Sequence, residues 1–140
     1  MKVYFSGSIS GGRAKEEAYL VIVESLEEQG CNVLSQHVAR PELLAASRAD
    51  PAELTYTQDM GWLAESQAVV AEVTTPSLGV GYEICHALAI GKPVLCLYEE
   101  GAGLSKMILG NTQPGIVVRS YSDMGSLRAA LHAFVTGVGS

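Results

Sequence analysis

Short apolar runs alternate along the chain with stretches in which apolar residues recur at helical spacing. Residues 2–6 form the first apolar run, which is typical of a buried strand. The stretch 7–12 is too rich in glycine to continue that strand, so it predicts a turn. Apolar residues then recur at the period of one helix face over 13–29, and Gly30 follows as a C-terminal stop. The beginning of the chain therefore predicts one strand–loop–helix unit.

The same alternation continues to the end of the chain, except in one segment. We predict further strands at 31–34, 68–73, 93–98 and 116–119, and further helices at 56–67, 81–90, 106–109 and 122–135. Between 36 and 55 the pattern is irregular, with Pro41 and Pro51 on either side of a short apolar stretch. We predict a long excursion there, containing one or two helical turns.

Strands that alternate with helices predict an α/β fold. Five strands in this order suit a doubly wound parallel sheet of the Rossmann or flavodoxin kind. A length of 140 residues suits a single domain, 1–140, because one hydrophobic core typically serves about 100–150 residues. Ligands of such sheets bind at the carboxyl ends of the strands. Functional residues are therefore expected directly after the first, third and fourth strands.

The charge balance limits the classes of partner. Fifteen acidic residues against nine Lys and Arg give a net charge of −6, without a basic run that could follow a phosphate backbone. We expect no nucleic-acid partner. A single small anion is still compatible with this charge, because a few backbone N–H groups and one cation suffice to bind it.

The sequence predicts neither a membrane span nor export. No apolar run reaches about 18 residues, and no apolar signal region precedes residues 2–5. Cys31, Cys85 and Cys96 are odd in number and lack metal-ligand spacing, which favours reduced core thiols and a cytoplasmic protein. The three histidines also lack ligand spacing, so we expect neither a metal nor another cofactor.

The glycine-rich turn after the first strand is a candidate phosphate site. It offers unblocked backbone N–H groups, the hydroxyls of Ser8 and Ser10, and the cation of Arg13 at the start of a helix. It matches neither a P-loop nor the GxGxxG fingerprint. Taken alone, the pattern also fits an ordinary turn.

The segment after the third strand has a similar composition. Ser77 and Gly79 precede a predicted helix, and Glu83 stands in its first turn. A carboxylate at that place is also compatible with a solvated face, where it interacts with the helix dipole. Asp59, in the preceding predicted helix, is equally compatible with a surface position.

Several motifs in the same order resemble a known enzyme family. They are YFSGSI at 4–9 with GGR at 11–13, QHV at 36–38, QD at 58–59 with Trp62, VAEVT at 70–74 and PSLGVGYE at 76–83. Together they resemble the 2'-deoxynucleoside 5'-phosphate N-hydrolases, which belong to the wider nucleoside 2-deoxyribosyltransferase superfamily. The resemblance runs from Tyr4 to about Gly110.

The resemblance implies cleavage of the N-glycosidic bond of a 2'-deoxynucleoside 5'-monophosphate by a retaining double displacement. Glu83 matches the nucleophile, Asp59 the carboxylate that assists protonation of the leaving base, and Tyr4 the tyrosine that positions the nucleophile. Further residues match substrate contacts, most of them to the phosphate: Ser6, Gly7, Ser8, Ile9, Ser10, Gly12, Arg13, Ser77 and Gly79. Ser105 matches a serine that reaches the phosphate from the neighbouring subunit, which implies a homodimer.

Chemistry is consistent with these roles. The transition state of glycosidic cleavage resembles an oxocarbenium ion, so a carboxylate beneath the sugar stabilises it and can capture it covalently. A second carboxyl group must protonate the base, and two acids in one pocket push their pKa values apart. A hydrogen bond from Tyr4 would favour the ionised form of Glu83.

Two features limit how far the resemblance extends. Several family members carry an arginine where this chain has Ser10, which leaves phosphate affinity and the choice of base open. Residues 38–55 match poorly, so base preference is not carried over. His37 lies inside a motif, where ligand contact, packing and hydrogen bonding of the loop are all compatible with it.

Three other functions remain open at this point. A deoxyribosyltransferase would pass the sugar to a second base and would not require a 5'-phosphate. A ribonucleotide N-glycosidase would differ in tolerating a 2'-hydroxyl. A non-catalytic nucleotide-binding module would use the same crevice without turnover.

Overall fold

The computed structural model describes residues 1–9 and 15–139. Its five strands are β1 (Lys2–Gly7), β2 (Asn32–Val33), β3 (Ala68–Glu72), β4 (Val94–Glu99) and β5 (Ile116–Tyr121). Its helices are α1 (Glu16–Glu28), the 3₁₀ turn η1 (Gln36–Val38), α2 (Pro41–Ser47), α3 (Ala52–Glu65), α4 (Leu78–Ala89), α5 (Lys106–Leu109) and α6 (Met124–Gly139).

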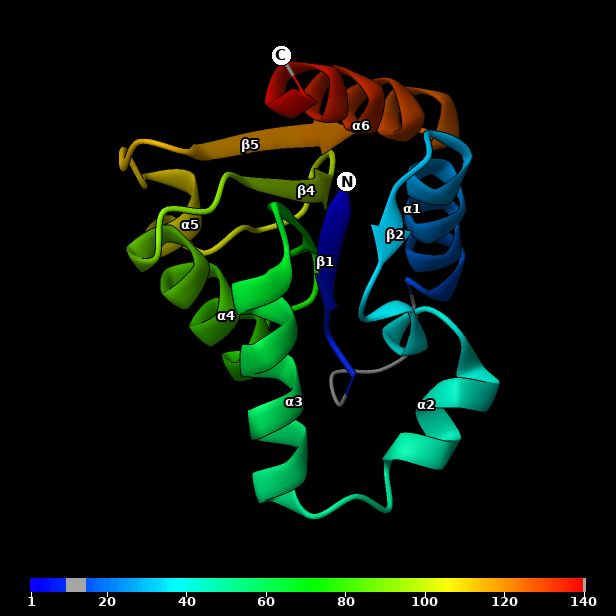
Figure 1. The fold of residues 1–140 in the computed structure, drawn as a ribbon. Helices are drawn as coiled ribbons and strands as arrows, with labels where there is room; N and C mark the ends of the chain where they lie inside the picture. Colours follow the sequence, from blue (N-terminus) through cyan, green and yellow to red (C-terminus); the bar gives the residue numbers. More distant parts are fainter. Residues whose placement is uncertain (10–14, 140) are drawn as a thin grey trace.

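All strand pairs are parallel, in the order β2-β1-β3-β4-β5 (Figure 1). The predicted α/β fold with a five-stranded parallel sheet is thus confirmed, and the strand order is that of flavodoxin-like sheets. After β1 the chain forms the edge strand β2 on one side of β1, and then forms β3 on the other side of β1. The direction in which strands are added to the sheet therefore reverses between β1 and β3. Gly7 and Glu72, opposite each other, mark their carboxyl ends. Ligands of doubly wound sheets bind at such a point.

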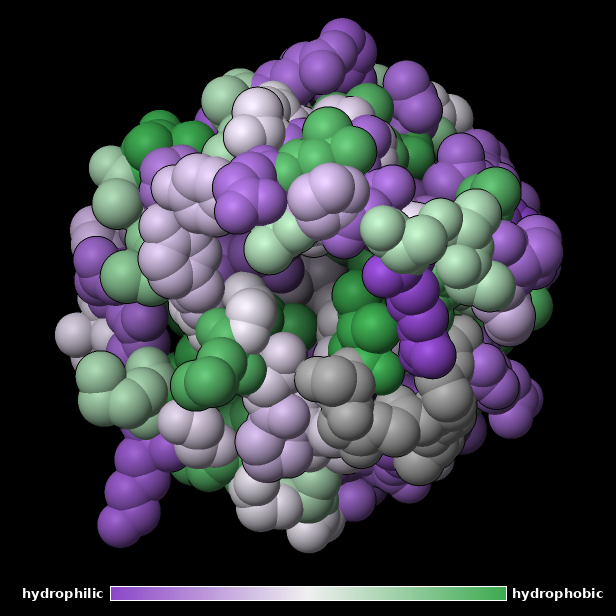
Figure 2. All heavy atoms as spheres, turned by 90° about the horizontal axis from the view of Figure 1, so that it is seen from below, coloured by the Kyte–Doolittle hydropathy of each residue, from purple (hydrophilic) through white to green (hydrophobic). Residues whose placement is uncertain are grey.

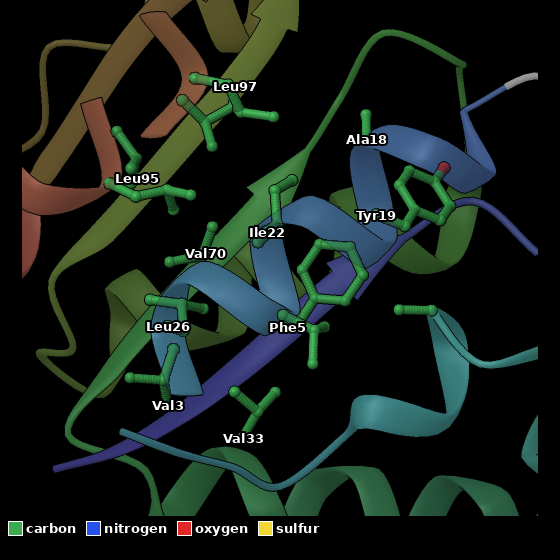
Figure 3. Packing of buried hydrophobic residues seen from close by; sticks show 14 of the residues in the cluster. Val3, Phe5, Ala18, Tyr19, Ile22, Leu26, Val33, Val70, Leu95 and Leu97 are labelled. Atoms are coloured by element: carbon green, nitrogen blue, oxygen red, sulfur yellow. The ribbon is translucent and has the colours of Figure 1, made fainter. Parts of the chain in front are cut away.

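Helices cover both faces of the sheet. On one face, α1 and α6 pack over strand residues that include Val3 and Phe5. Figure 3 shows Ile22 and Leu26 of α1 lying over these strands. Burying each such side chain contributes about 1.5–3 kcal/mol to folding. On the opposite face, α3 and α4 pack over alternate strand residues, beginning with Tyr4. Successive residues of β1 therefore face different layers.

The excursion between β2 and β3 is more regular than predicted. We expected one or two helical turns within 36–55, whereas η1 and α2 lie there and α3 already begins at Ala52 rather than at residue 56. The two prolines explain the difference. Pro41 is the first residue of α2 and Pro51 immediately precedes α3, which are positions where proline favours the start of a helix rather than interrupting one.

Helix α4 also begins earlier than predicted, at Leu78 instead of residue 81. Ser77 is its N-cap, because its hydroxyl accepts a hydrogen bond from the Val80 N–H at 3.3 Å. Glu83 therefore stands in the second turn and not in the first. The prediction that all three cysteines belong to the core is wrong for Cys85, which is exposed on α4.

Among residues 1–9 and 15–139, no helix is long and apolar enough to cross a bilayer.

Candidate functional site

Tyr4 and Ser6 contact the side chain of Glu83 near the carboxyl end of β1. Residues two apart on a strand share a face, so both side chains of β1 point toward α4. The Tyr4 hydroxyl donates a hydrogen bond to Glu83 Oε2, and Ser6 Oγ donates to Glu83 Oε1 at 2.9 Å. Each carboxylate oxygen thus has its own donor. Glu83 is not a carboxylate on a solvated face, the alternative that the sequence left open.

The environment of Glu83 sets its pKa. Burial raises this pKa to about 7, whereas the hydrogen bonds from Tyr4 and Ser6 lower it and the charge of Asp59 raises it. Tyr4 does favour the ionised form, as expected, but burial has the larger effect. Burial, followed by the charges of Glu83 and Asp59, raises the pKa of Tyr4 far above its usual range. The phenol therefore keeps its proton and remains a donor at every physiological pH.

Asp59 faces the same site from α3. Burial raises the pKa of its carboxyl group, and a hydrogen bond with Tyr4 partly offsets this. Its Oδ1 atom is buried and makes no hydrogen bond within the described part of the chain. A buried oxygen without a protein partner is costly unless a ligand or a proton satisfies it. Asp59 is thus suited to hold a proton close to Glu83.

This pair of acids lines two adjoining cavities. One is about 300 Å³ and the other about 220 Å³. Gly7, Ile9, Asp59 and Glu83 line both of them. Figure 2 shows this end of the molecule, below the view of Figure 1, with a recess near its centre. A sugar placed over Glu83 could extend its two substituents into the two cavities.

The larger of the two cavities contains predicted phosphate contacts. Ser77 and Gly79, at the start of α4, line it together with Tyr56 and Tyr82. Gly7 also lines this cavity, and its missing side chain leaves space for the Tyr19 ring, because a Cβ at this position would lie 2.9 Å from that ring. His37 lines the smaller cavity and packs against Trp62, with ring centroids 5.5 Å apart.

Not every predicted contact lines these cavities. Ser8 is buried, and its carbonyl accepts a hydrogen bond from the Tyr19 hydroxyl at 3.3 Å. Ser105 is exposed at the N-cap of α5, in a neighbouring groove that shares Ser77 and Val80 with the larger cavity. The predicted contacts Ser10, Gly12 and Arg13 lie outside the described residues.

The structure also assigns residues that the sequence analysis overlooked or placed differently. Ser6 was expected among the substrate contacts and lines the smaller cavity, and its hydroxyl also holds Glu83; the two-residue spacing from Tyr4 was the available signal for this second role. Arg48, Asp50 and Gln58 line the smaller cavity. Gln58 belongs to the QD motif at 58–59 but was given no role, and no local pattern identified Arg48 or Asp50, because α2 and α3 approach β1 only in the folded chain.

The family model described as nucleoside 2-deoxyribosyltransferase matches residues 3–124. The chain belongs to this family. The resemblance inferred from the motifs is confirmed.

Several named proteins are similar in sequence or structure to most of this chain. A Methanosarcina barkeri protein, "Putative 2'-deoxynucleoside 5'-phosphate N-hydrolase 1", is 47% identical over 134 residues, covering 96% of this chain and 84% of that protein. The rat 5-hydroxymethyl-dUMP N-hydrolase is 49% identical over 112 residues, covering 77% and 68%. The solved Clostridium botulinum CMP N-glycosidase BcmB superposes with a TM-score of 0.73 at 19% identity, covering 96% and 99%. The last comparison supports the fold.

Proposed function

We propose that this protein hydrolyses the N-glycosidic bond of a 2'-deoxynucleoside 5'-monophosphate, giving the free base and 2-deoxyribose 5-phosphate. Family membership and the names of the relatives support cleavage of an N-glycosidic bond in a nucleotide. The main structural support is the partly buried Glu83 carboxylate, which accepts from Tyr4 and Ser6 and lines two cavities together with Asp59.

The proposed reaction has two displacements. Glu83 attacks the anomeric carbon as the C1'–N bond breaks, and Asp59 delivers a proton to the departing base. Water then attacks the anomeric carbon of the glycosyl ester, giving its proton to the Asp59 carboxylate and releasing Glu83. Configuration is retained, because the anomeric carbon is inverted twice. Neither step requires a metal or an organic cofactor.

Release of free base tests the proposal directly. The substrates are deoxynucleoside monophosphates, ribonucleoside monophosphates and unphosphorylated deoxynucleosides, each with and without a second base. We expect release from deoxynucleotides without base exchange. Base exchange that does not depend on the 5'-phosphate would indicate a deoxyribosyltransferase. Release of base mainly from ribonucleotides would indicate a ribonucleotide N-glycosidase. Tight nucleotide binding without release of base would indicate a binding module.

Replacing Tyr4 with Phe should shift the pH dependence of the reaction. The Tyr4 hydroxyl lowers the pKa of Glu83, so its removal should raise that pKa above about 7. Because the nucleophile must be ionised, the acid limb of kcat/KM should move to higher pH, and the loss should be greater at pH 6 than at pH 8. Ser6→Ala should move the limb in the same direction. An equal loss at every pH would contradict this role.

We also propose that the active unit is a homodimer in which Ser105 reaches the neighbouring site. Ser105 lies in a groove of about 550 Å³ and does not line the cavities beside Glu83 in its own subunit. Apolar side chains around this groove are exposed, with Leu78 at 96% and Met107 at 81%. Large exposed apolar groups of this kind are typical of protein interfaces.

Mixed dimers test the role of Ser105. Ser105→Ala should raise KM for nucleotides, and Glu83→Gln should be inactive. In a heterodimer of the two, one site receives Glu83 from one chain and Ser105 from the other, so random mixing should restore about one site in four. Absence of restoration, or a fully active monomer by sedimentation, would reject the proposal. Ser120→Ala, an exposed serine on β5, is the control.

A further inference from the structure

Glu72 is a buried carboxylate that the proposed reaction does not use. It is the last residue of β3, and its side chain is 0% exposed. Isolated buried charges are strongly unfavourable, so this carboxylate requires donors around it.

Three donors surround the Glu72 carboxylate. Thr74 donates twice, from its backbone N–H to Oε1 and from Oγ1 to Oε2, both at 2.7 Å. The Tyr121 hydroxyl, from the end of β5, donates to Oε2 at 2.5 Å. All three donors point at this one carboxyl group, so it ties Thr74 and Tyr121 to the end of β3.

The same network connects the loop after β3 to β4. Thr74 Oγ1 accepts a hydrogen bond from the Glu99 backbone N–H at 2.9 Å, so the hydroxyl that donates to Glu72 also contacts the end of β4. The Val73 N–H donates to the Leu97 carbonyl at 2.8 Å. The backbone that follows β3 is therefore fixed against the ends of both β4 and β5.

This fixed backbone leads directly into the predicted phosphate contacts. Only Thr75 and Pro76 separate Thr74 from Ser77, which caps α4 and lines the larger cavity beside Glu83. A shift of Thr74 would displace Ser77 and Gly79 together. Small misplacements of binding groups lower rates and affinities strongly, because recognition depends on fixed geometry.

We propose that Glu72 and Tyr121 are positioning residues that hold the start of α4 in place for the 5'-phosphate of the substrate. This inference rests on the proposed function. Neither side chain lines the cavities beside Glu83, so both act through Thr74 and Ser77.

Tyr121→Phe and Glu72→Gln test the proposal. The first removes one donor but keeps the ring, and the second replaces one accepting oxygen with an amide nitrogen. We expect KM for the deoxynucleotide to rise about tenfold, as for loss of one charge-assisted hydrogen bond, with kcat changed less than about threefold. The inhibition constant of 2-deoxyribose 5-phosphate should rise equally, whereas that of an unphosphorylated deoxynucleoside should not. Tyr98→Phe, on β4, is the control.

A role in stability alone would give a different result. The melting temperature would then fall while the constants for phosphorylated and unphosphorylated ligands stayed unchanged or moved together, which would overturn the proposal. If Glu72→Gln does not fold, Tyr121→Phe gives the same comparison. If the wild-type protein releases no base, the proposed function fails. Calorimetric titration with deoxynucleotide and deoxynucleoside still measures whether Tyr121→Phe selectively weakens phosphate binding.

Discussion

Glu83→Gln is expected to lower base release from a deoxynucleotide by at least about 10⁴-fold, the scale seen when a covalent nucleophile is removed. The amide oxygen can still accept from one of the two hydroxyls of Tyr4 and Ser6, and the other hydroxyl can turn to accept from the amide N–H, so the site should stay assembled. It cannot supply the negative charge that stabilises an oxocarbenium-like state, nor form the glycosyl ester. The rate of base release in a single turnover, monitored by chromatography, measures this loss of activity.

Matched controls separate this chemical effect from a folding defect. Glu53→Gln, an exposed carboxylate on α3, should retain activity. The wild-type protein with a slow substrate should gain the mass of 2-deoxyribose 5-phosphate on Glu83, whereas Glu83→Gln should not. More than about 1% residual activity in Glu83→Gln, or a labelled residue other than Glu83, would refute the assignment.

The pH dependence of stability provides a second control. The folded protein raises the pKa of Glu83 to about 7 from 4.5, so folding becomes less favourable as pH rises between these values and this group ionises. Glutamine has no such titration. Glu83→Gln should therefore melt higher than the wild-type protein at pH 8, and the difference should vanish below about pH 4.5. This destabilisation is typical of a catalytic group held in an unfavourable environment.

Much of the sheet could be predicted because its signals are local. The apolar run of β1 is short and bounded by glycine, and its alternation places Tyr4 and Ser6 on one face. The segment between β2 and β3 could not be predicted as reliably, since Pro41 and Pro51 indicate both a break and a helix start. Sequence cannot distinguish these cases without the packing of α2 and α3.

The site shows the same division. Family motifs identified Glu83, Tyr4 and Asp59, and the fold brings these three together from α4, β1 and α3. The network of Glu72 was not predicted, because Tyr121 follows it by 49 residues and no pattern links the two. The roles of all these side chains in catalysis, and the phosphate contacts of the glycine-rich turn, stay predictions.

Asp59→Asn is expected to lower kcat by about 10²- to 10⁴-fold, the usual contribution of a general acid. Burial raises the pKa of Asp59, which favours the protonated acid that the leaving base requires. In the wild-type protein the rate should rise as Glu83 ionises and fall as Asp59 loses its proton, giving a bell-shaped profile. Because the acids interact, both limbs belong to the pair rather than to either residue. In Asp59→Asn the basic limb should disappear while the acid limb remains.

A comparison of substrates with different leaving bases distinguishes two roles for Asp59, donation of a proton and stabilisation by its charge alone. A donor matters most for a base that leaves poorly as an anion, so the loss in Asp59→Asn should shrink as the base becomes more acidic. Asp50→Asn is a matched control, because Asp50 lines the same smaller cavity and should change KM or base preference but keep the basic limb. An equal loss for every base would assign Asp59 to charge stabilisation of the sugar. The proton would then have to reach the base from water or from another group beside Glu83.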